Sequence, residues 1–439
     1  MKKFFIVSLL LIVCGTFVFA NGGQQASGAG ASANVLYWVT SDDANVTRRM
    51  VEAYNATNPA QKIELVLVPG AETEISKLMT AVRSGTGPDI YGLDRFTIGE
   101  RAAQGLLEDI TEPLKKIDPN LSSKYLDFAW AETQYNGKTY GLPTLTDTRV
   151  LFYRKDILRQ KGVDYSRLDP KNGPITIAEL KTITDKLNET DAQGNYTRIG
   201  YIPYATENQG WHYILGFSFG GKFADLQAKK VTPLDPGVVA AYQYFYDTAK
   251  ELGPQKVRTF LSTYAPPNNP PQQNYFFTGH SPITVQGDWF IQDIIRWAPD
   301  IEWDYTYLPI LKKGDKITTF AGGGSMVVPK GAKNVEGAIK AMTWWTGETG
   351  QRLECELGLK ARLPTWRSLI NDDSLYIPEY KFAKDLLPVA QNRPVLPIHA
   401  FYWDQLTIAQ NDVANNLKTP QEALKQVETL SQAQYDRFK

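Results

Sequence analysis

The sequence predicts an α/β fold with mostly parallel central sheets flanked by helices. Short apolar runs rich in β-favouring residues recur early in the chain, helical apolar spacing separates them, and Gly- or Pro-containing turns end each segment. Alternating strands and helices place neighbouring strands side by side through right-handed crossovers. The carboxyl ends of the strands should then meet at one edge, where such sheets bind their ligands.

Three strand–helix units occupy the chain up to Gly105. Their strands are runs of Val, Ile, Leu and Tyr with few charges, which is typical of strands buried on both faces. Asn58-Pro59 and Gly85-Thr86-Gly87-Pro88 end the first two helices, since neither sequence continues a helix. We expect strands at 35–39, 63–68 and 89–93, and helices at 46–54 and 74–83.

Later segments continue this mixture of strands and helices. Asn136-Gly137 is a strong β-hairpin signal between two short strands. The sequence shows no internal repeat of about 20–50 residues, which argues against a solenoid. We expect strands at 150–153, 283–289, 305–309 and 320–328, a helix at 238–252, and a mainly helical chain from residue 334.

Residues 1–20 have the pattern of a secretory signal peptide. Two lysines precede an uncharged apolar run at 4–19, which is short for a membrane span of about 20 residues. Val18 and Ala20 provide the small residues of a cleavage site. The protein should therefore be exported to the periplasm. Residues 21–33, rich in Gly, Ala, Ser and Gln, should form a flexible linker.

The two cysteines, Cys14 and Cys355, bear on export and on stability. Lipid attachment at Cys14 is the alternative to cleavage after Ala20, although Val13 stands where a lipobox prefers a small residue. Once the signal peptide is removed, a single thiol remains and no internal disulfide can form. Stability must then come from the core, which a chain of this length can build.

Composition argues against several classes of protein. The 47 basic residues balance the 47 acidic ones without a basic stripe, which argues against a nucleic-acid partner. The three histidines lack metal-ligand spacing, so we expect no metal, no cofactor and no enzyme. A secreted glycoside hydrolase with two carboxylates is the alternative, since acidic residues are plentiful. Aromatic residues, at 12%, suit either a large core or a ring-lined binding surface.

Six segments, taken in their order along the chain, carry a family resemblance. They are VLYWVTSDDANVTRRMVEAYNATNP, SGTGPDIYGLD, YNGKTYGLPTLTDTRVLFYRKDIL, FFTGHSPITVQGDWFIQDI, FAGGGSMVVPKGAKNVEGAIKAMTWWT and GLKARLPTWRS. Together they resemble an extracellular solute-binding protein of the sugar-binding class, related to maltose-binding protein, which serves an ABC importer. No single segment is specific, but the resemblance runs from residue 34 to the end of the chain.

The resemblance implies a two-lobe periplasmic binding protein fold in which the chain crosses between the lobes three times. The matching crossings fall near 142–144, 284–286 and 324–326. Paired strands and short loops at the crossings can absorb a hinge rotation. The implied boundaries are 34–143 plus 286–324 for lobe one and 144–285 plus 325–439 for lobe two.

The resemblance also implies a function. The protein would act as the substrate-binding component of an ABC transporter, capturing a carbohydrate in the interlobe cleft and delivering it to permease subunits at the membrane. It would work as a monomer. The alternative ligand is another polar solute such as glycerol phosphate.

Two strand ends supply candidate ligand contacts, because sheets of this type bind ligands at the carboxyl ends of their strands. Asp42 and Asp43 follow the first predicted strand, and Asp94 and Arg95 end the third. The first pair could instead cap the next helix, and Arg95 could hold Asp94 in place. Trp38 lies within the first strand, where it suits either the core or the ligand.

Further contacts follow from the resemblance. Sugars present hydroxyls around an apolar face, so their sites need planar hydrogen-bonding groups and an aromatic ring. Trp211 and Trp289 would supply such rings, although Trp211 also suits a core. Glycines at the third crossing permit either close approach to a ligand or a hinge turn. The implied contacts are Asp147, Asn208, Trp211, Trp289, Gly323, Gly324 and Arg362.

Overall fold

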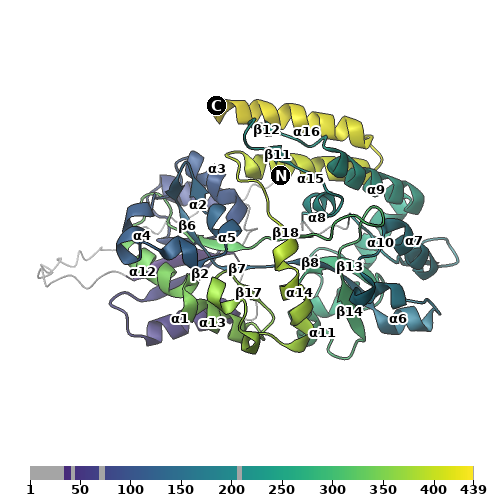
Figure 1. Cartoon of the computed structure of the whole chain (residues 1–439), viewed down its shortest axis with the longest axis horizontal. Coiled ribbons are helices and arrows are strands. Elements are labelled where there is room, and N and C mark those ends of the chain that lie inside the picture. The colour runs from purple at the N-terminus through teal and green to yellow at the C-terminus, as the bar shows by residue number, and fades with distance from the viewer. Residues whose placement is uncertain (1–33, 41–44, 69–74, 205–209, 439) are drawn as a thin grey trace, which may run out of the picture. The chain divides into compact units, whose positions relative to one another are not determined.

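The computed structural model describes residues 34–40, 45–68, 75–204 and 210–438, shown in Figure 1. The predicted signal peptide at 1–20 and linker at 21–33 lie outside these residues, as do the predicted contacts Asp42, Asp43 and Asn208. Two β-sheets organise the described residues, and each is built from segments far apart in the sequence.

The first sheet joins strands from both halves of the chain. Its order is β2 (Ile63–Leu67), β1 (Val35–Val39), β3 (Ile90–Asp94), β16 (Gly324–Val327) and β6 (Gly141–Pro143). β1 runs parallel to β2 and β3, whereas β16 pairs antiparallel with β3 and β6. The parallel pairing brings the carboxyl ends of β1 and β3 to the same edge.

Side chains along β1 alternate between the two faces of this sheet. Val35, Tyr37 and Val39 pack into an apolar cluster with α1 (Val46–Ala56) and α12 (Val335–Thr346). Trp38 packs against a smaller cluster on the other face, which includes residues of α2 (Ser76–Arg83) and α3 (Ile98–Ala103). The predicted strand–helix units of the first hundred residues are confirmed, with helices on both faces (Figure 1).

The second sheet has the order β13 (Ile283–Gly287), β8 (Arg149–Arg154) and β14 (Trp303–Thr306). Leu151 and Tyr153 of β8 belong to a large apolar cluster that includes residues of α8 (Trp211–Ser218), α9 (Pro236–Leu252), α15 (His399–Ala414) and α16 (Pro420–Tyr435). Val150 and Phe152 belong to the cluster of the opposite face, where Phe152 meets Phe290 of α11 (Phe290–Trp297). Every residue of β8 is buried, as its apolar run predicts.

Strand pairing corrects two expectations. The sheets are not mostly parallel, because β16 is antiparallel to its neighbours and every pairing of the second sheet is antiparallel. The chain does not change sheets at 284–286, since β13 pairs with β8 along its whole length. β14 also joins β8, so residues 303–306 do not belong to lobe one as predicted. β16 joins β3, so residues 325–327 do not belong to lobe two as predicted. These pairings depend on long-range hydrogen bonds that a resemblance does not specify.

Two extended segments connect the sheets and lie side by side. Residues 144–148 lead from β6 to β8, and residues 321–323 lead from β15 (Thr319–Phe320) to β16. Thr146 Oγ1 donates to the carbonyl of Gly322 at 2.9 Å, which ties one segment to the other. The chain therefore changes sheets close to the first and third of the predicted crossings.

The remaining elements are mostly short. No helix of the described residues combines the length and the apolarity that a bilayer crossing requires. The other helices are α4 (Thr111–Ile117), α5 (Asp127–Ala131), α6 (Lys155–Gln160), α7 (Ile177–Thr184), α10 (Pro254–Tyr264), α13 (Glu348–Leu357) and α14 (Lys381–Asp385). The other strands are β4 (Gln134–Tyr135), β5 (Lys138–Thr139), β7 (Leu145–Thr146), β9 (Glu189–Thr190), β10 (Tyr196–Arg198), β11 (Ala224–Asp225), β12 (Lys230–Val231), β17 (Leu363–Pro364) and β18 (Ala390–Gln391).

Candidate functional site

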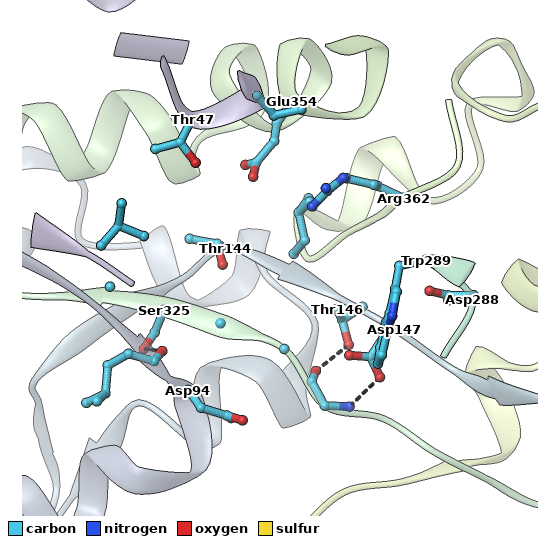
Figure 2. Close-up of a pocket in the computed structure, with 18 of the residues that line it drawn as sticks. Thr47, Asp94, Thr144, Thr146, Asp147, Asp288, Trp289, Ser325, Glu354 and Arg362 are labelled. Carbon is cyan, nitrogen blue, oxygen red and sulfur yellow. Dashed lines mark hydrogen bonds between the residues drawn. The ribbon is translucent and has the colours of Figure 1, made fainter. Parts of the chain in front are cut away.

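A cavity of about 680 Å³ lies where the first sheet, the two connecting segments and the second sheet meet (Figure 2). It lies at the carboxyl ends of β1 and β3, the edge at which such sheets bind ligands. Small-molecule sites usually have volumes of about 300–1,000 Å³. The wall includes Tyr37, Thr47, Asp94, Thr144, Thr146, Asp147, Arg149, Asp288, Trp289, Asp293, Phe320, Gly322, Gly323, Gly324, Ser325, Trp345, Glu354, Arg362, Arg393 and Trp403.

Half of the contacts predicted from the sequence lie in this wall. Figure 2 shows Asp147, Trp289 and Arg362 grouped at one end of the cavity, with Asp94 at the other. The structure therefore brings together residues that are more than 250 positions apart in the chain. The six predicted contacts in the wall are Asp94, Asp147, Trp289, Gly323, Gly324 and Arg362.

Two ion pairs, one buried and one partly buried, form the polar floor of the cavity. Arg393 Nη2 lies 3.0 Å from Asp94 Oδ1, and Arg149 Nη1 donates to Asp147 Oδ1. Gly322 lies between the pairs: its N–H donates to Asp147 Oδ1 at 3.0 Å, and an added Cβ would lie 3.5 Å from Arg393 Nη2. Two guanidinium groups thus balance two carboxylates, and the floor carries no net charge.

The indole ring of Trp289 rests against protein groups. The guanidinium carbon of Arg149 lies 4.3 Å from the ring centroid. A Cβ added to Gly287 would lie 2.0 Å from Cζ3 of Trp289, so the glycine backbone packs directly on the six-membered ring. Pairing of β8 with β13 places Arg149 opposite Gly287 and so brings these groups together. Part of the predicted stacking surface is therefore already occupied by Arg149.

Two cavity carboxyl groups lie in surroundings that favour their protonated forms. Burial and repulsion from Asp147 raise the pKa of Asp288 to about 8, although the N–H of Thr148 donates to its carboxyl at 2.8 Å. Burial also raises the pKa of Glu354, which accepts a hydrogen bond from the indole of Trp345 at 3.2 Å. A protonated carboxyl group can donate a hydrogen bond to a ligand hydroxyl oxygen and can also accept one from a ligand hydroxyl group.

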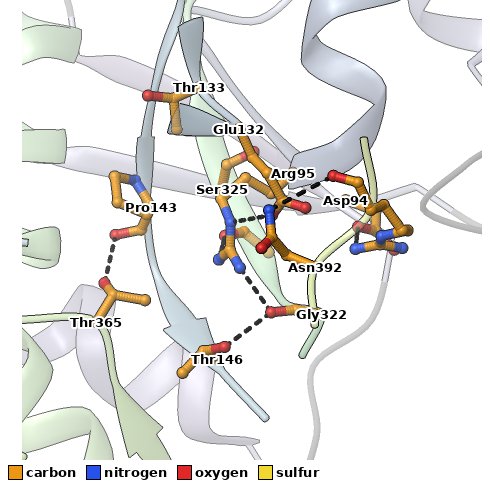
Figure 3. Close-up of polar contacts among 12 residues, drawn as sticks. Asp94, Arg95, Glu132, Thr133, Pro143, Thr146, Gly322, Ser325, Thr365 and Asn392 are labelled. Atoms are coloured by element: carbon orange, nitrogen blue, oxygen red, sulfur yellow. Dashed lines mark hydrogen bonds and ion pairs between the residues drawn. The ribbon is translucent and has the colours of Figure 1, made fainter. Parts of the chain in front are cut away.

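Arg95 does not face the cavity but binds the two connecting segments (Figure 3). Its Nε pairs with Glu132 Oε2 at 2.8 Å, and both side chains are fully buried. Its Nη2 donates to the carbonyl of Gly322 at 2.6 Å, and its Nη1 donates to the carbonyls of Leu145 and Gly324 at 3.2 Å each. The structure does not place the predicted contact Arg95 in the cavity wall, and backbone carbonyls and Glu132 take up its donors.

Two predicted tryptophans also lie away from the cavity. Trp211 begins α8 and is 1% exposed within the large apolar cluster of the second sheet. Trp38 packs on the face of β1 opposite to Tyr37, and it is Tyr37 that lines the cavity. The structure places neither ring in the cavity wall, for one physical reason. A tryptophan in an apolar run suits a core as well as a binding site, and only the direction of its side chain distinguishes them.

Sequence reasoning missed several residues of the wall. Arg149 and Asp288 adjoin predicted contacts, so their positions beside Asp147 and Trp289 were the signal that could have found them. Arg393 and Glu354 have no such signal. Glu354 reaches the cavity from within α13, and Arg393 reaches it because the long segment after α13 returns there. No local pattern shows either path.

The chemistry of the wall is that of binding. Within the residues that the structure describes, no three His, Cys, Asp or Glu side chains gather to hold a metal ion. The wall instead offers carboxyl, guanidinium and hydroxyl groups beside aromatic rings, which is the mixture that orients a small polar ligand.

Comparisons with known proteins place this site in a family context. Residues 49–374 match the bacterial extracellular solute-binding protein family. A galactooligosaccharide-binding protein of Bacillus subtilis (strain 168) is 23% identical, covering 98% of this chain and 94% of that protein. A maltotriose-binding protein of Pyrococcus abyssi (strain GE5 / Orsay) is 25% identical over 78% of this chain and 69% of that protein.

Solved structures share the fold. CpMnBP1 with mannobiose bound superposes with a TM-score of 0.77 at 22% identity, covering 91% of this chain and 99% of that one. Maltose-bound MalE3 of T. maritima superposes with a TM-score of 0.67 at 20% identity, covering 93% and 100%. The predicted two-lobe α/β fold is therefore confirmed. Since the family match spans most of its length, this chain belongs to the bacterial extracellular solute-binding proteins.

Proposed function

We propose that this protein captures a short, uncharged oligosaccharide in the cavity and delivers it to the permease subunits of an ABC importer. The observation that carries this proposal is the charge balance of the cavity floor, where Asp94 pairs with Arg393 and Asp147 pairs with Arg149. A neutral polyol can exchange hydrogen bonds with such groups and leaves no buried charge without its counterion. Relatives named for galactooligosaccharide and maltotriose binding support the same ligand class.

An anionic solute such as glycerol phosphate fits this wall less well. A phosphate needs cationic groups whose charge is not already compensated. The guanidinium groups of Arg149 and Arg393 each have a carboxylate partner, and Arg362 lies close enough to Glu354 to lower its pKa against the effect of burial. The carboxylate of Asp293 in the same wall would also repel an anion.

Each of the two sheets would form the centre of one lobe. Strand pairing supports a lobe of 34–143 plus 324–364 and a lobe of 149–320, and the apolar cluster of the second sheet adds 396–438 to the latter. The connecting segments and residues 365–395 join the two lobes. A ligand that touches residues of both lobes favours the state in which they are closed around it. The protein would work as an exported monomer, with residues 1–20 as its signal peptide, and would release its ligand chemically unchanged.

The test is a thermal-shift screen of the mature protein, followed by calorimetric titration. The panel contains neutral oligosaccharides, among them maltotriose, mannobiose and galactotriose, together with uronates, sugar phosphates and glycerol phosphate. A neutral oligosaccharide should bind, and Asp147→Asn should weaken its binding. Asp247→Asn, on the exposed side of α9, is the matched control and should bind like the wild type. Preference for an anionic solute, or turnover of a bound glycan, would contradict the proposal.

A further inference from the structure

Arg149 covers one face of the Trp289 ring at the cavity. The guanidinium carbon of Arg149 lies 4.3 Å from the centroid of Trp289 and 5.0 Å from that of Phe320. The backbone of Gly287 packs on the same indole, since a Cβ there would lie within 2.3 Å of three consecutive ring atoms. A sugar could stack on the covered face only if Arg149 moved away.

Arg149 is held firmly in this place. Its N–H donates to Thr319 Oγ1 at 2.8 Å, and the Thr319 hydroxyl donates back to its carbonyl at 2.7 Å. Its side chain is 7% exposed and pairs with Asp147, which in turn accepts the N–H of Gly322. The backbone, an ion pair and two aromatic rings therefore all restrain the guanidinium in one orientation.

One edge of this guanidinium has no hydrogen-bond acceptor within the described part of the chain. Asp147 accepts from Nη1, whereas Nε and Nη2 form the other edge, which carries two parallel N–H groups. Nε is buried, and among the described residues it has no hydrogen-bond acceptor. A buried donor without an acceptor is costly, so a ligand oxygen that reaches this edge gains more than it would at an exposed arginine.

We propose that Arg149 is the specificity-determining residue of this end of the cavity, donating from Nε and Nη2 to a pair of oxygens on adjacent carbons of a sugar ring. Trp289 and Phe320 are its positioning residues, and they act by covering the guanidinium rather than by stacking on the ligand. This inference rests on the proposed function and names the chemistry that selects the ligand. A planar guanidinium suits two neighbouring oxygens, whereas an ammonium group offers no such parallel pair.

The stacking role and the positioning role of Trp289 predict opposite results for Arg149. If Trp289 stacks on the sugar, Arg149→Ala uncovers the ring and leaves affinity unchanged or improved. If Arg149 binds the sugar, Arg149→Ala raises the Kd by about tenfold to a hundredfold, the effect expected of charge-assisted hydrogen bonds. Arg149→Lys keeps a cation beside Asp147, and so preserves the fold, but should also raise the Kd about tenfold.

A double-mutant cycle separates the two roles further. Trp289→Leu should raise the Kd in the wild-type background but have no additional effect in Arg149→Ala, because the ring then has nothing to position. Additive effects of the two substitutions would overturn the inference. Each variant is titrated calorimetrically with the oligosaccharide that binds the wild type most tightly in the panel containing maltotriose, mannobiose and galactotriose.

Controls distinguish failure of this inference from failure of the proposed function. Arg83→Ala, at an exposed arginine of α2, should bind like the wild type. If the wild type binds an oligosaccharide and both Arg149 variants bind it equally well, the inference is wrong and the proposed function stands. If the wild type binds no oligosaccharide of the panel, the proposed function fails and this inference fails with it.

Discussion

The guanidinium of Arg95 and the carboxylate of Glu132 form a fully buried ion pair, 2.8 Å apart, beside the two segments that connect the sheets. The same guanidinium binds carbonyls of both segments, so they are joined through one side chain (Figure 3). Rotation of one lobe on the other would have to carry this cluster as a unit or break it. The pair therefore bears on both stability and closure.

Arg95→Met should lower the free energy of unfolding by about 3–5 kcal/mol, because it leaves the Glu132 carboxylate buried without its cation. Urea denaturation of the purified protein measures this. Arg83→Met is the matched control and should cost less than about 0.5 kcal/mol at its exposed position. Arg95→Met combined with Glu132→Leu should recover part of the loss. If Arg95→Met were as stable as Arg83→Met, this account of the pair would be contradicted.

Gly323→Ala should destabilise the protein far more than Gly331→Ala. Both glycines have positive φ, +125° and +79°, so both substitutions strain the backbone. A Cβ at Gly323 would also lie 2.2 Å from the carbonyl oxygen of Leu145, whereas nothing lies within 4 Å of a Cβ at Gly331. Strain alone costs about 1–2 kcal/mol. Thermal unfolding should show a clearly larger loss for Gly323→Ala, and equal losses would mean that this contact does not matter.

Stability should fall as the pH rises from about 4 to about 8, in part through Asp288. Its pKa in the folded state is about 8, above the value of about 3.9 for an unfolded aspartate. The folded protein therefore holds a proton that the unfolded chain releases across this window, which costs stability as the pH rises. Denaturation at several pH values should show a smaller fall for Asp288→Asn than for the wild type. Asp247→Asn should keep the wild-type slope.

Trp211→Phe should lower stability and leave ligand affinity unchanged. The indole is 1% exposed in the cluster of the second sheet, and loss of part of its volume should cost about 1–3 kcal/mol. Calorimetric titration with the ligand of the wild type checks the affinity, and denaturation checks the stability. A rise in Kd without a loss of stability would indicate that Trp211 contacts the ligand and contradict its role in the core.

The local sequence pattern was sufficient to predict most of the strands and helices. The runs at 35–39, 63–68 and 150–153 form strands because they alternate or bury apolar side chains over the length of a strand. Asn136-Gly137 forms its hairpin because both residues adopt positive φ, which few other residues tolerate. These features depend on neighbouring residues alone, so the sequence predicts them directly.

The candidate site was predicted only in part. Asp94 and Arg95 are adjacent, yet the first lines the cavity and the second is buried against the two connecting segments. Tyr37 and Trp38 are likewise adjacent and face opposite sides of β1. Strand ends indicated the right region, but the direction of each side chain depends on which other strands of the chain pair with its own strand.

The amino-acid sequence by itself determined the α/β class and the pattern of strands and helices, because periodicity and turn chemistry act over a few residues. Only the tertiary structure decided that β14 joins β8, that β16 joins β3, and that Arg393 reaches Asp94. Those contacts depend on hydrogen bonds and ion pairs between distant segments. Their partners are chosen by how the whole chain packs, which no local pattern of residues encodes.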